Sequence, residues 1–464
     1  MLSNKYNFNK VFFLFITITC FSHHTFSQDE TIDSLKSKLV LAQSTEKIDL
    51  LHQLTRELWY YEPDEAMKYA EMAYQLSFSF NDSSNMAMAL KNKGIVLYFT
   101  GENKNAINCY NKALKIYTKL NEKKGISSCV NNLGIIYMDL GNYKKALLFY
   151  QKSIQTDIEL NDEQALASSL SNAGIVYHFQ GMYDMAIAYY QKSLALEIKF
   201  KNYDGIGECL MNIGVAYQDN GMSPESKNYY DKALIIFKKT ANKNRFAMTC
   251  YNIAKMLYTQ KDYFKSYLYI RHSLKIRYEI DDLQGIASGL NLLALIYEAT
   301  GNDEKANEYL FKSLLMELEL GNKRRASIVL SNKGMMLLKN EEYEEALNFF
   351  LNSMEIAKDI NARHELLDNY QNLSKVYYLI DDSTRGLYYD DMYWILADSI
   401  QKDAKHFSKG SLFVKDSNEK VKTSRVNHDL NGTETDKKMY YFIFSAAFVI
   451  FIIVFIFLRS KKST

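Results

Sequence analysis

Small and large apolar residues repeat along most of the chain with a step of forty residues. Three successive units read KNKGIVLYFTGENKNAINCYNKAL at 91–114, NNLGIIYMDLGNYKKALLFYQKSI at 131–154 and SNAGIVYHFQGMYDMAIAYYQKSL at 171–194. In each unit, apolar residues recur at helical spacing on both sides of a central glycine, which is typical of two helices joined by a turn. The pattern therefore predicts one helical hairpin per unit.

One small position recurs in the first predicted helix of every unit, and a second recurs twelve residues later. Small residues let two antiparallel helices approach closely. The first position is bulky only at Leu54, and nine units keep the register without an insertion, which predicts nine hairpins. The first set is Leu54, Gly94, Gly134, Gly174, Gly214, Ala254, Ala294, Gly334 and Ser374, and the second is Ala66, Ala106, Ala146, Ala186, Ser226, Ser266, Ala306, Ala346 and Gly386.

A large residue and a turn signal complete the unit. Three residues after the first small position stands an aromatic residue or a leucine, as at Tyr137 and Leu337. A glycine then usually follows, and glycine there fits the left-handed position that ends a helix. These glycines are Gly101, Gly141, Gly181, Gly221 and Gly301.

At this spacing of small, aromatic and turn residues, the units resemble tetratricopeptide repeats (TPR) over residues 45–400. The resemblance implies an all-α solenoid, a right-handed superhelix of about nine hairpins whose first helices face a concave surface. The usual repeat has 34 residues, so each forty-residue unit is longer by six. Shared between two helices, these residues add roughly 9 Å of helix per hairpin.

An asparagine stands two residues before the first small position in almost every unit, with a gap at Leu292. In TPR peptide binders this place faces the concave surface, where the amide pairs with a bound peptide. An amide suits that task because it both donates and accepts hydrogen bonds. Alternatively, each asparagine bonds a neighbouring helix and fixes the hairpin spacing; the sequence does not separate the two readings. The residues are Asn92, Asn132, Asn172, Asn212, Asn252, Asn332 and Asn372.

Charged and titratable residues fall near the same inner face at helical spacing, namely Asp139, His178, Asp219, Lys255 and Lys375. Such a groove would be mixed in charge, and no clamp of paired basic residues for a carboxylate is evident. We therefore predict an extended, mostly neutral peptide or a partner helix as the ligand. For each charged residue taken singly, a solvated helix face is the alternative reading.

The first 27 residues have the layout of a signal peptide, with Lys5 before the apolar run 11–21 and a predicted cut after Ser27. Lipid attachment at Cys20 is an alternative that the residues before it fit poorly. Residues 28–44 then form a lead-in to the repeats.

Near the other end, residues 440–458 are apolar except for Ser445. At about 1.5 Å per residue they can span a hydrocarbon core of about 30 Å. We predict a polar spacer at 401–438, a transmembrane helix at 439–458 and a cytoplasmic tail at 459–464. Together with the cleaved signal, this predicts a single-pass membrane protein whose repeats are periplasmic.

Composition and motifs exclude several other functions. The chain has 56 basic and 54 acidic residues, for a net charge of +2, with no basic stripe, so we expect no nucleic acid partner. It has no phosphate loop and no nucleophile motif, and its histidines lack metal-ligand spacing. We therefore expect no catalytic, cofactor-binding or metal-binding residue, and no enzyme activity.

Two function classes remain. In the first, the chain is a membrane-anchored scaffold whose groove binds a protein or an extended peptide. In the second, it is the sensor half of a truncated or split signal-transduction protein. A signal peptide, a TPR array and a membrane helix resemble the periplasmic half of bacterial sensor kinases and transcription regulators, without their cytoplasmic output domain. That class implies a homodimer or a separate cytoplasmic output protein, because a single span cannot otherwise report binding.

Overall fold

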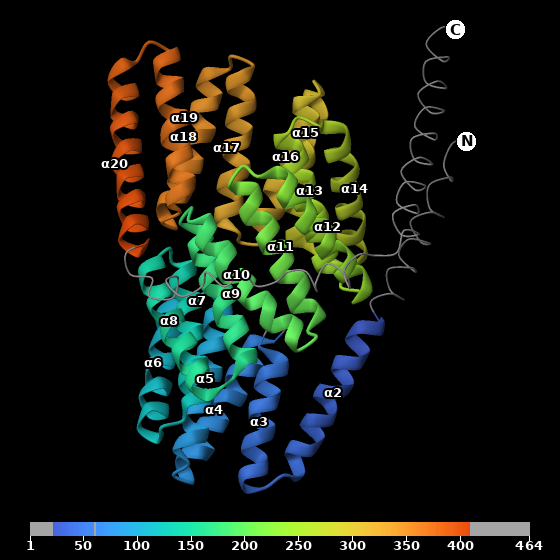
Figure 1. Ribbon diagram of the computed structural model, residues 1–464, viewed down its shortest axis with the longest axis vertical. Coiled ribbons are helices and arrows are strands. Elements are labelled where there is room, and N and C mark those ends of the chain that lie inside the picture. Colours follow the sequence, from blue (N-terminus) through green and yellow to red (C-terminus); the bar gives the residue numbers. More distant parts are fainter. Residues whose placement is uncertain (1–21, 60–61, 409–464) are drawn as a thin grey trace, which may run out of the picture. The chain divides into compact units, whose positions relative to one another are not determined.

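The computed structural model describes residues 22–59 and 62–408. Within these residues the chain forms helices α2 to α20 and no strand, in the order shown in Figure 1. The prediction of an all-α helical-repeat array is thus confirmed. The chain divides into two compact bodies between Val176 and Tyr177, and each body is described by itself.

The first body contains the helices up to α9, whose last three residues belong to the second body. These helices are α2 (Ser22–Leu41), α3 (Ser44–Leu58), α4 (Pro63–Ser79), α5 (Ser83–Phe99), α6 (Asn103–Leu120), α7 (Lys123–Asp139), α8 (Tyr143–Leu160) and α9 (Glu163–Phe179).

The second body continues the alternation of first and second helices in each unit. Its helices are α10 (Tyr183–Lys199), α11 (Tyr203–Asp219), α12 (Ser223–Lys239), α13 (Lys243–Thr259), α14 (Tyr263–Glu279), α15 (Leu283–Ala299), α16 (Asp303–Glu319), α17 (Lys323–Lys339), α18 (Tyr343–Asp359), α19 (Arg363–Leu379) and α20 (Ser383–Ser408).

The turns between helices share one geometry. In the turn from α5 to α6, the Gly101 amide donates to the Tyr98 carbonyl at 3.0 Å, and the Glu102 amide donates to the Leu97 carbonyl at 2.8 Å. This pair of bonds closes the end of the helix around a left-handed residue. Left-handed residues recur every twenty positions, at Asn81, Gly101, Asn121, Gly141, Asn161, Gly181, Lys201, Gly221, Ala241, Lys261, Asp281, Gly301, Gly321, Glu341, Asn361 and Asp381.

The predicted turn glycines are therefore confirmed, but they mark only one of two equal turns per unit. The residue after each left-handed position is the N-cap of the next helix, as where the Asn142 side chain accepts from the Lys145 amide at 3.1 Å. Most helices have 17 residues, in both halves of a unit. The lengthened unit thus consists of two equal helices and two equal turns.

The first small position faces the residue sixteen places later, in the second helix of the same hairpin. A Cβ added to Gly134 would lie 2.6 Å from the Tyr150 ring, and one added to Gly214 would lie 2.7 Å from the Tyr230 ring. Both rings are fully buried. Burying an aromatic side chain stabilises the fold by about 4 kcal/mol, and here only glycine leaves room for the ring.

The sizes at these two positions are complementary. Where the later residue is aliphatic, the first position is alanine, as for Ala294 and Leu310 in one buried cluster. In the first unit the sizes are reversed, because the large residue, Leu54, is in the first helix and the small residue, Ala70, is in the second. Both are fully buried. Leu54 is therefore no departure from the repeat, because the pair conserves the volume between the two helices.

Among residues 22–59 and 62–408, no helix is both long enough and apolar enough to cross a membrane. The predicted membrane helix at 439–458 and tail at 459–464 lie outside the described residues, as do residues 1–21 of the predicted signal peptide. Helix α2 begins at Ser22 and passes the predicted cut after Ser27. Helix α20 passes the predicted end of the array at residue 400 and ends at Ser408.

The size complementarity makes a testable prediction. Gly134→Ala and Tyr150→Leu should each lower the urea-unfolding midpoint of the full chain, the first by overpacking and the second by leaving a cavity. The double variant recreates the Ala294 and Leu310 pair. It should lose less stability than the sum of the single variants, by about 1–3 kcal/mol. Strictly additive losses would contradict the pairing.

Candidate functional site

The first helices line the inner side of each body. Successive first helices contact one another, as α11 does with α13 and α13 with α15, and no pair of successive second helices in the described residues contacts as closely. In a curved stack the more closely spaced helices lie on the concave side. The row of asparagines, which stands on the first helices, therefore lies in the part of the array that faces inward.

Two asparagines of the row are bonded across the stack. The Asn172 amide donates to the Asn131 side-chain oxygen at 3.1 Å, linking α9 to α7. The Asn332 amide donates to the Asn291 side-chain oxygen at 3.0 Å, linking α17 to α15 in the same way. At these places the amide fixes the spacing of successive hairpins, which is the alternative that the sequence left open.

A third asparagine is bonded to a histidine. The Asn92 amide nitrogen lies 3.2 Å from Nδ1 of His52, and both residues are buried. Burial lowers the pKa of His52 to about 4. The ring is therefore neutral at physiological pH, and its Nδ1 accepts a hydrogen bond from Asn92.

The other members of the row are free of such bonds. Their side chains are half-buried and have no hydrogen-bond partner among the described residues. The row is thus divided into asparagines that hold the stack together and asparagines whose amides remain available. The available ones are Asn132 in the first body and Asn212, Asn252 and Asn372 in the second.

The second body brings three predicted site residues together. His178 Nε2 lies 2.8 Å from Asp219 Oδ2, and Lys255 is close enough to act on the charge of Asp219. Burial alone would raise the pKa of Asp219, but the hydrogen bond from His178 and the charge of Lys255 together hold that pKa below its ordinary value. The predicted mixed charge of the inner face is therefore locally balanced.

Asn212 and Asn252, whose amides have no hydrogen-bond partner among the described residues, lie on the same helix faces as Asp219 and Lys255. Asn252 precedes Lys255 by three residues on α13, and Asn212 precedes Asp219 by seven on α11. Both spacings place side chains on one face of a helix. The inner surface of α11 and α13 therefore offers two unpaired amides beside a neutralised ion pair.

The remaining predicted charges are placed differently. In the first body, Asp139 accepts a hydrogen bond from the Tyr98 hydroxyl. Burial, together with this bond to a carboxylate, raises the pKa of Tyr98 above its ordinary range. In the second body, Lys375 is exposed on α19, one turn after Asn372.

Several of these contacts follow a regular spacing that was not predicted from the sequence. Polar side chains forty-one residues apart join successive first helices, as for His178 and Asp219. Two further pairs, Lys339 with Glu298 at 2.9 Å and Arg324 with Glu365 at 2.7 Å, follow the same spacing and were not predicted. A search for complementary residues at that spacing would have found them.

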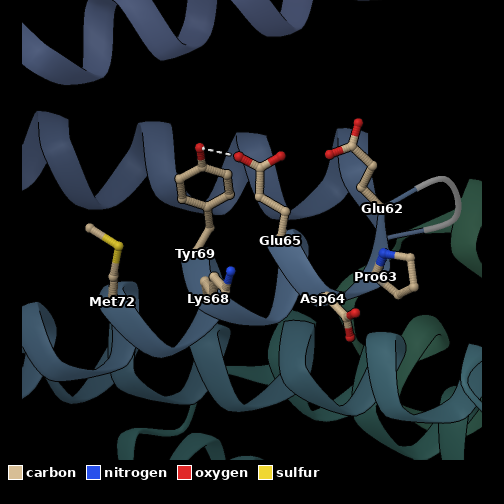
Figure 2. A pocket seen from close by; sticks show the side chains of 7 residues that line it. All are labelled: Glu62, Pro63, Asp64, Glu65, Lys68, Tyr69 and Met72. Carbon is tan, nitrogen blue, oxygen red and sulfur yellow. Dashed lines mark hydrogen bonds between the residues drawn. The ribbon is translucent and has the colours of Figure 1, made fainter.

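A groove of about 570 Å³ lies along the first half of α4 (Figure 2). Two of its polar groups are already paired, since the Tyr69 hydroxyl donates to Glu65 at 2.9 Å and Lys36 of α2 lies 3.0 Å from the same carboxylate. The groove is also lined by α4 and its cap alone. The inner face therefore remains the better candidate site.

Comparison with known proteins agrees with this geometry. Residues 89–119 and 126–199 each match a family model described as a tetratricopeptide repeat. The units within these two ranges are tetratricopeptide repeats. No curated protein matches the chain by sequence.

Solved structures share the TPR-like fold. A Rap protein complexed with Competence and Sporulation Factor matches with a TM-score of 0.56 and 13% identity, over 77% of this chain and 99% of that one. The Rap conjugation gene regulator of plasmid pLS20, in complex with the Phr* peptide, gives 0.53 and 15%, over 76% and 96%. Aspartyl phosphate phosphatase F from Bacillus subtilis gives 0.51 and 15%, over 77% and 95%. At these identities the likeness establishes the fold alone.

The division of the asparagine row predicts two different responses to truncation. Asn172→Ala and Asn332→Ala each remove a hydrogen bond between hairpins, so each should cost about 1 kcal/mol of stability. Asn212→Ala and Asn252→Ala remove no bond and should leave the urea-unfolding midpoint unchanged or slightly raised, because alanine favours helix. Equal losses in the two pairs of variants would show that the division is wrong.

Proposed function

We propose that this chain is a membrane-anchored, extracytoplasmic TPR scaffold that binds a peptide or a protein partner along the inner face of its first helices. One observation carries the proposal: three half-buried amides of the second body, Asn212, Asn252 and Asn372, have no hydrogen-bond partner among the described residues. An extended peptide supplies alternating donors and acceptors that suit a row of amides.

The structural relatives support this use of the fold. Two of them are complexes, one with Competence and Sporulation Factor and one with the Phr* peptide. Their likeness to this chain is one of fold, so the ligand itself is proposed from the side chains of this chain. We propose binding rather than catalysis, since the chain carries no catalytic motif.

The chemistry of the inner face favours an extended, mostly neutral ligand. The charge of Asp219 is balanced by His178 and Lys255. The row of asparagines is interrupted at Leu292, and in the next unit Met335 is 43% exposed on α17. Leu292 itself is buried, so a ligand with a polar backbone and some apolar side chains would match the amides and the exposed Met335 beside them.

The membrane anchor and the periplasmic location rest on the predicted signal peptide at 1–27 and membrane helix at 439–458. The alternative function, a sensor half that signals across the membrane, is favoured by one observation. Helix α20 continues as a single helix from the array to Ser408, and the rest of the predicted spacer and the predicted membrane helix follow it in the sequence. A continuous helix can pass a change in position along its axis, whereas a flexible linker cannot.

The binding proposal predicts the effect of a triple variant. Asn212→Ala, Asn252→Ala and Asn372→Ala together should abolish recovery of the partner when the full chain is crosslinked in its native envelope and purified. Because these amides bond nothing in the fold, the thermal transition should stay within a few degrees of the parent. Mass spectrometry of the crosslinked material provides the measurement.

A matched control removes three amides from the exposed faces of second helices, at Asn228, Asn348 and Asn352. This control should recover the same partner as the parent chain. If the two triple variants recover the partner equally well, the inner face is not the binding site. If the first variant unfolds, the free amides are structural after all.

The topology makes a separate prediction. A phosphatase that is active only outside the cytoplasm should be active when fused within the spacer at 401–438 and inactive when fused after Thr464. The reverse pattern would overturn the orientation. Activity at both positions would show that 439–458 does not cross the membrane.

A further inference from the structure

Helix α20 ends the array with an edge that the earlier units cover. Leu347 of α18 is 6% exposed because it packs in one buried cluster with Leu373 of α19. Leu387 holds the same place one unit later and is 59% exposed. Both units have a leucine at this place, but no helix of the described residues packs over the leucine of α20.

The same contrast appears two turns further along α20. At the equivalent place in earlier second helices, Ile154, Leu234 and Leu274 are at most 6% exposed, and Leu114, Leu194, Leu314 and Met354 are half-buried. Leu274 is covered by α15, to which Leu290 of its cluster belongs. Trp394 stands at this place in α20 and is 68% exposed.

The outward stripe of α20 is also unlike that of α18. In α18 both of these exposed places are polar, at Asn348 and Glu355, and α8, α12 and α16 each expose an apolar residue at only one of them, Leu148, Ile235 and Leu315. The equivalent residues of α20 are Tyr388 and Ile395, which are 57% and 67% exposed. The last helix of a soluble repeat array normally presents a polar outer face, so an apolar face here indicates a contact surface.

Among the described residues, no tenth unit in register covers this edge. The left-handed turns recur every twenty residues up to Asp381, and the next would fall at residue 401. Helix α20 runs through that position and ends at Ser408. The segment that follows, at 409–438, is dominated by Lys, Ser, Asp and Asn, which makes it a poor cover for tryptophan and isoleucine.

We propose that the exposed edge of α20, consisting of Leu387, Tyr388, Trp394 and Ile395, pairs two copies of this chain in an antiparallel, two-fold contact. The same patch then serves on both sides of the interface, as in a closed dimer. In the earlier units, the second helix of one unit packs against the first helix of the next. The proposed contact places α20 of the second copy at the corresponding position on α20, so it continues the stacking of the array.

The charges along α20 favour the antiparallel arrangement. Asp391 lies on the exposed stripe before Trp394, and Lys402 lies on it three turns later, with a side chain 74% exposed. When two copies cross near Ile395, Asp391 of each copy faces Lys402 of the other. Lys402 Nζ already lies 2.5 Å from Asp398 Oδ2 of its own helix. In the dimer it would therefore contact two carboxylates, Asp398 of its own copy and Asp391 of the other.

The size of the edge predicts a modest affinity. Aromatic side chains bury 150–250 Å² each, so the exposed parts of Tyr388 and Trp394 contribute about 200–300 Å² per copy. That is well below the roughly 800 Å² per partner of a standard interface. The surface therefore fits a dimer in equilibrium with monomer in the micromolar range, rather than a permanent one.

Light scattering of the purified full chain across a concentration series tests the proposal. The parent should pass from monomer to dimer with rising concentration. Ile395→Glu gives α20 the residue that α18 has at this place, and with Trp394→Ala it should weaken association at least about tenfold. Leu148→Glu is the matched control, since Leu148 is 64% exposed on α8, outside the proposed contact, and it should leave association unchanged.

A charge reversal tests the orientation. Asp391→Lys alone and Lys402→Asp alone should each weaken the dimer, and the double variant should restore it. A parent that stays monomeric at every concentration overturns the proposal, as does a dimer that Ile395→Glu with Trp394→Ala leaves intact. A double reversal that fails to restore association overturns the antiparallel pairing. Circular dichroism of each variant verifies that the helices remain folded.

Discussion

The array depends on the contact between a small residue of each first helix and the residue sixteen places later in the second helix. At Gly134 and Tyr150 the ring occupies the space that a Cβ would need. At Leu54 the sizes are reversed, because Ala70 faces it from the second helix. This conserved volume sets the distance between the helices of a hairpin, and equal hairpins can then stack in register.

Regular stacking turns single residues into rows. With a left-handed turn every twenty residues, each first helix presents the same positions inward. Polar side chains such as His178 and Asp219 then join successive first helices at the forty-one-residue spacing. The asparagine row belongs to the same system, and its members serve two purposes. Asn172 and Asn332 hold neighbouring hairpins, while Asn212 and Asn252 keep amides that a ligand can use.

The inner face and the edge of α20 are separate surfaces with different chemistry. The inner face offers amides and balanced charges, which suit a peptide backbone. The edge offers Trp394 and Ile395, which suit burial against another helix. If a partner occupies one surface and a second copy the other, binding and association can be coupled only through small changes in the stacking of the hairpins. Helix α20 takes part in that stacking through its contact with α19.

The sequence was enough to predict the helical units, their number of residues and the place of the asparagine row, because these follow from local periodicity and from turn residues such as Gly101. It did not reveal that Lys201 and Ala241 adopt a left-handed backbone, which neither residue type favours. The sequence also could not show which asparagines of the row are hydrogen-bonded to a neighbouring helix and which are not. Asn172 is bonded because Asn131 lies within 3.1 Å on the neighbouring helix, and such a distance exists only once the hairpins are stacked. The sequence also does not show that Leu347 is buried and Leu387 exposed, since both are leucines at the same place in the repeat. Whether a neighbouring helix packs over each leucine is a property of the tertiary structure.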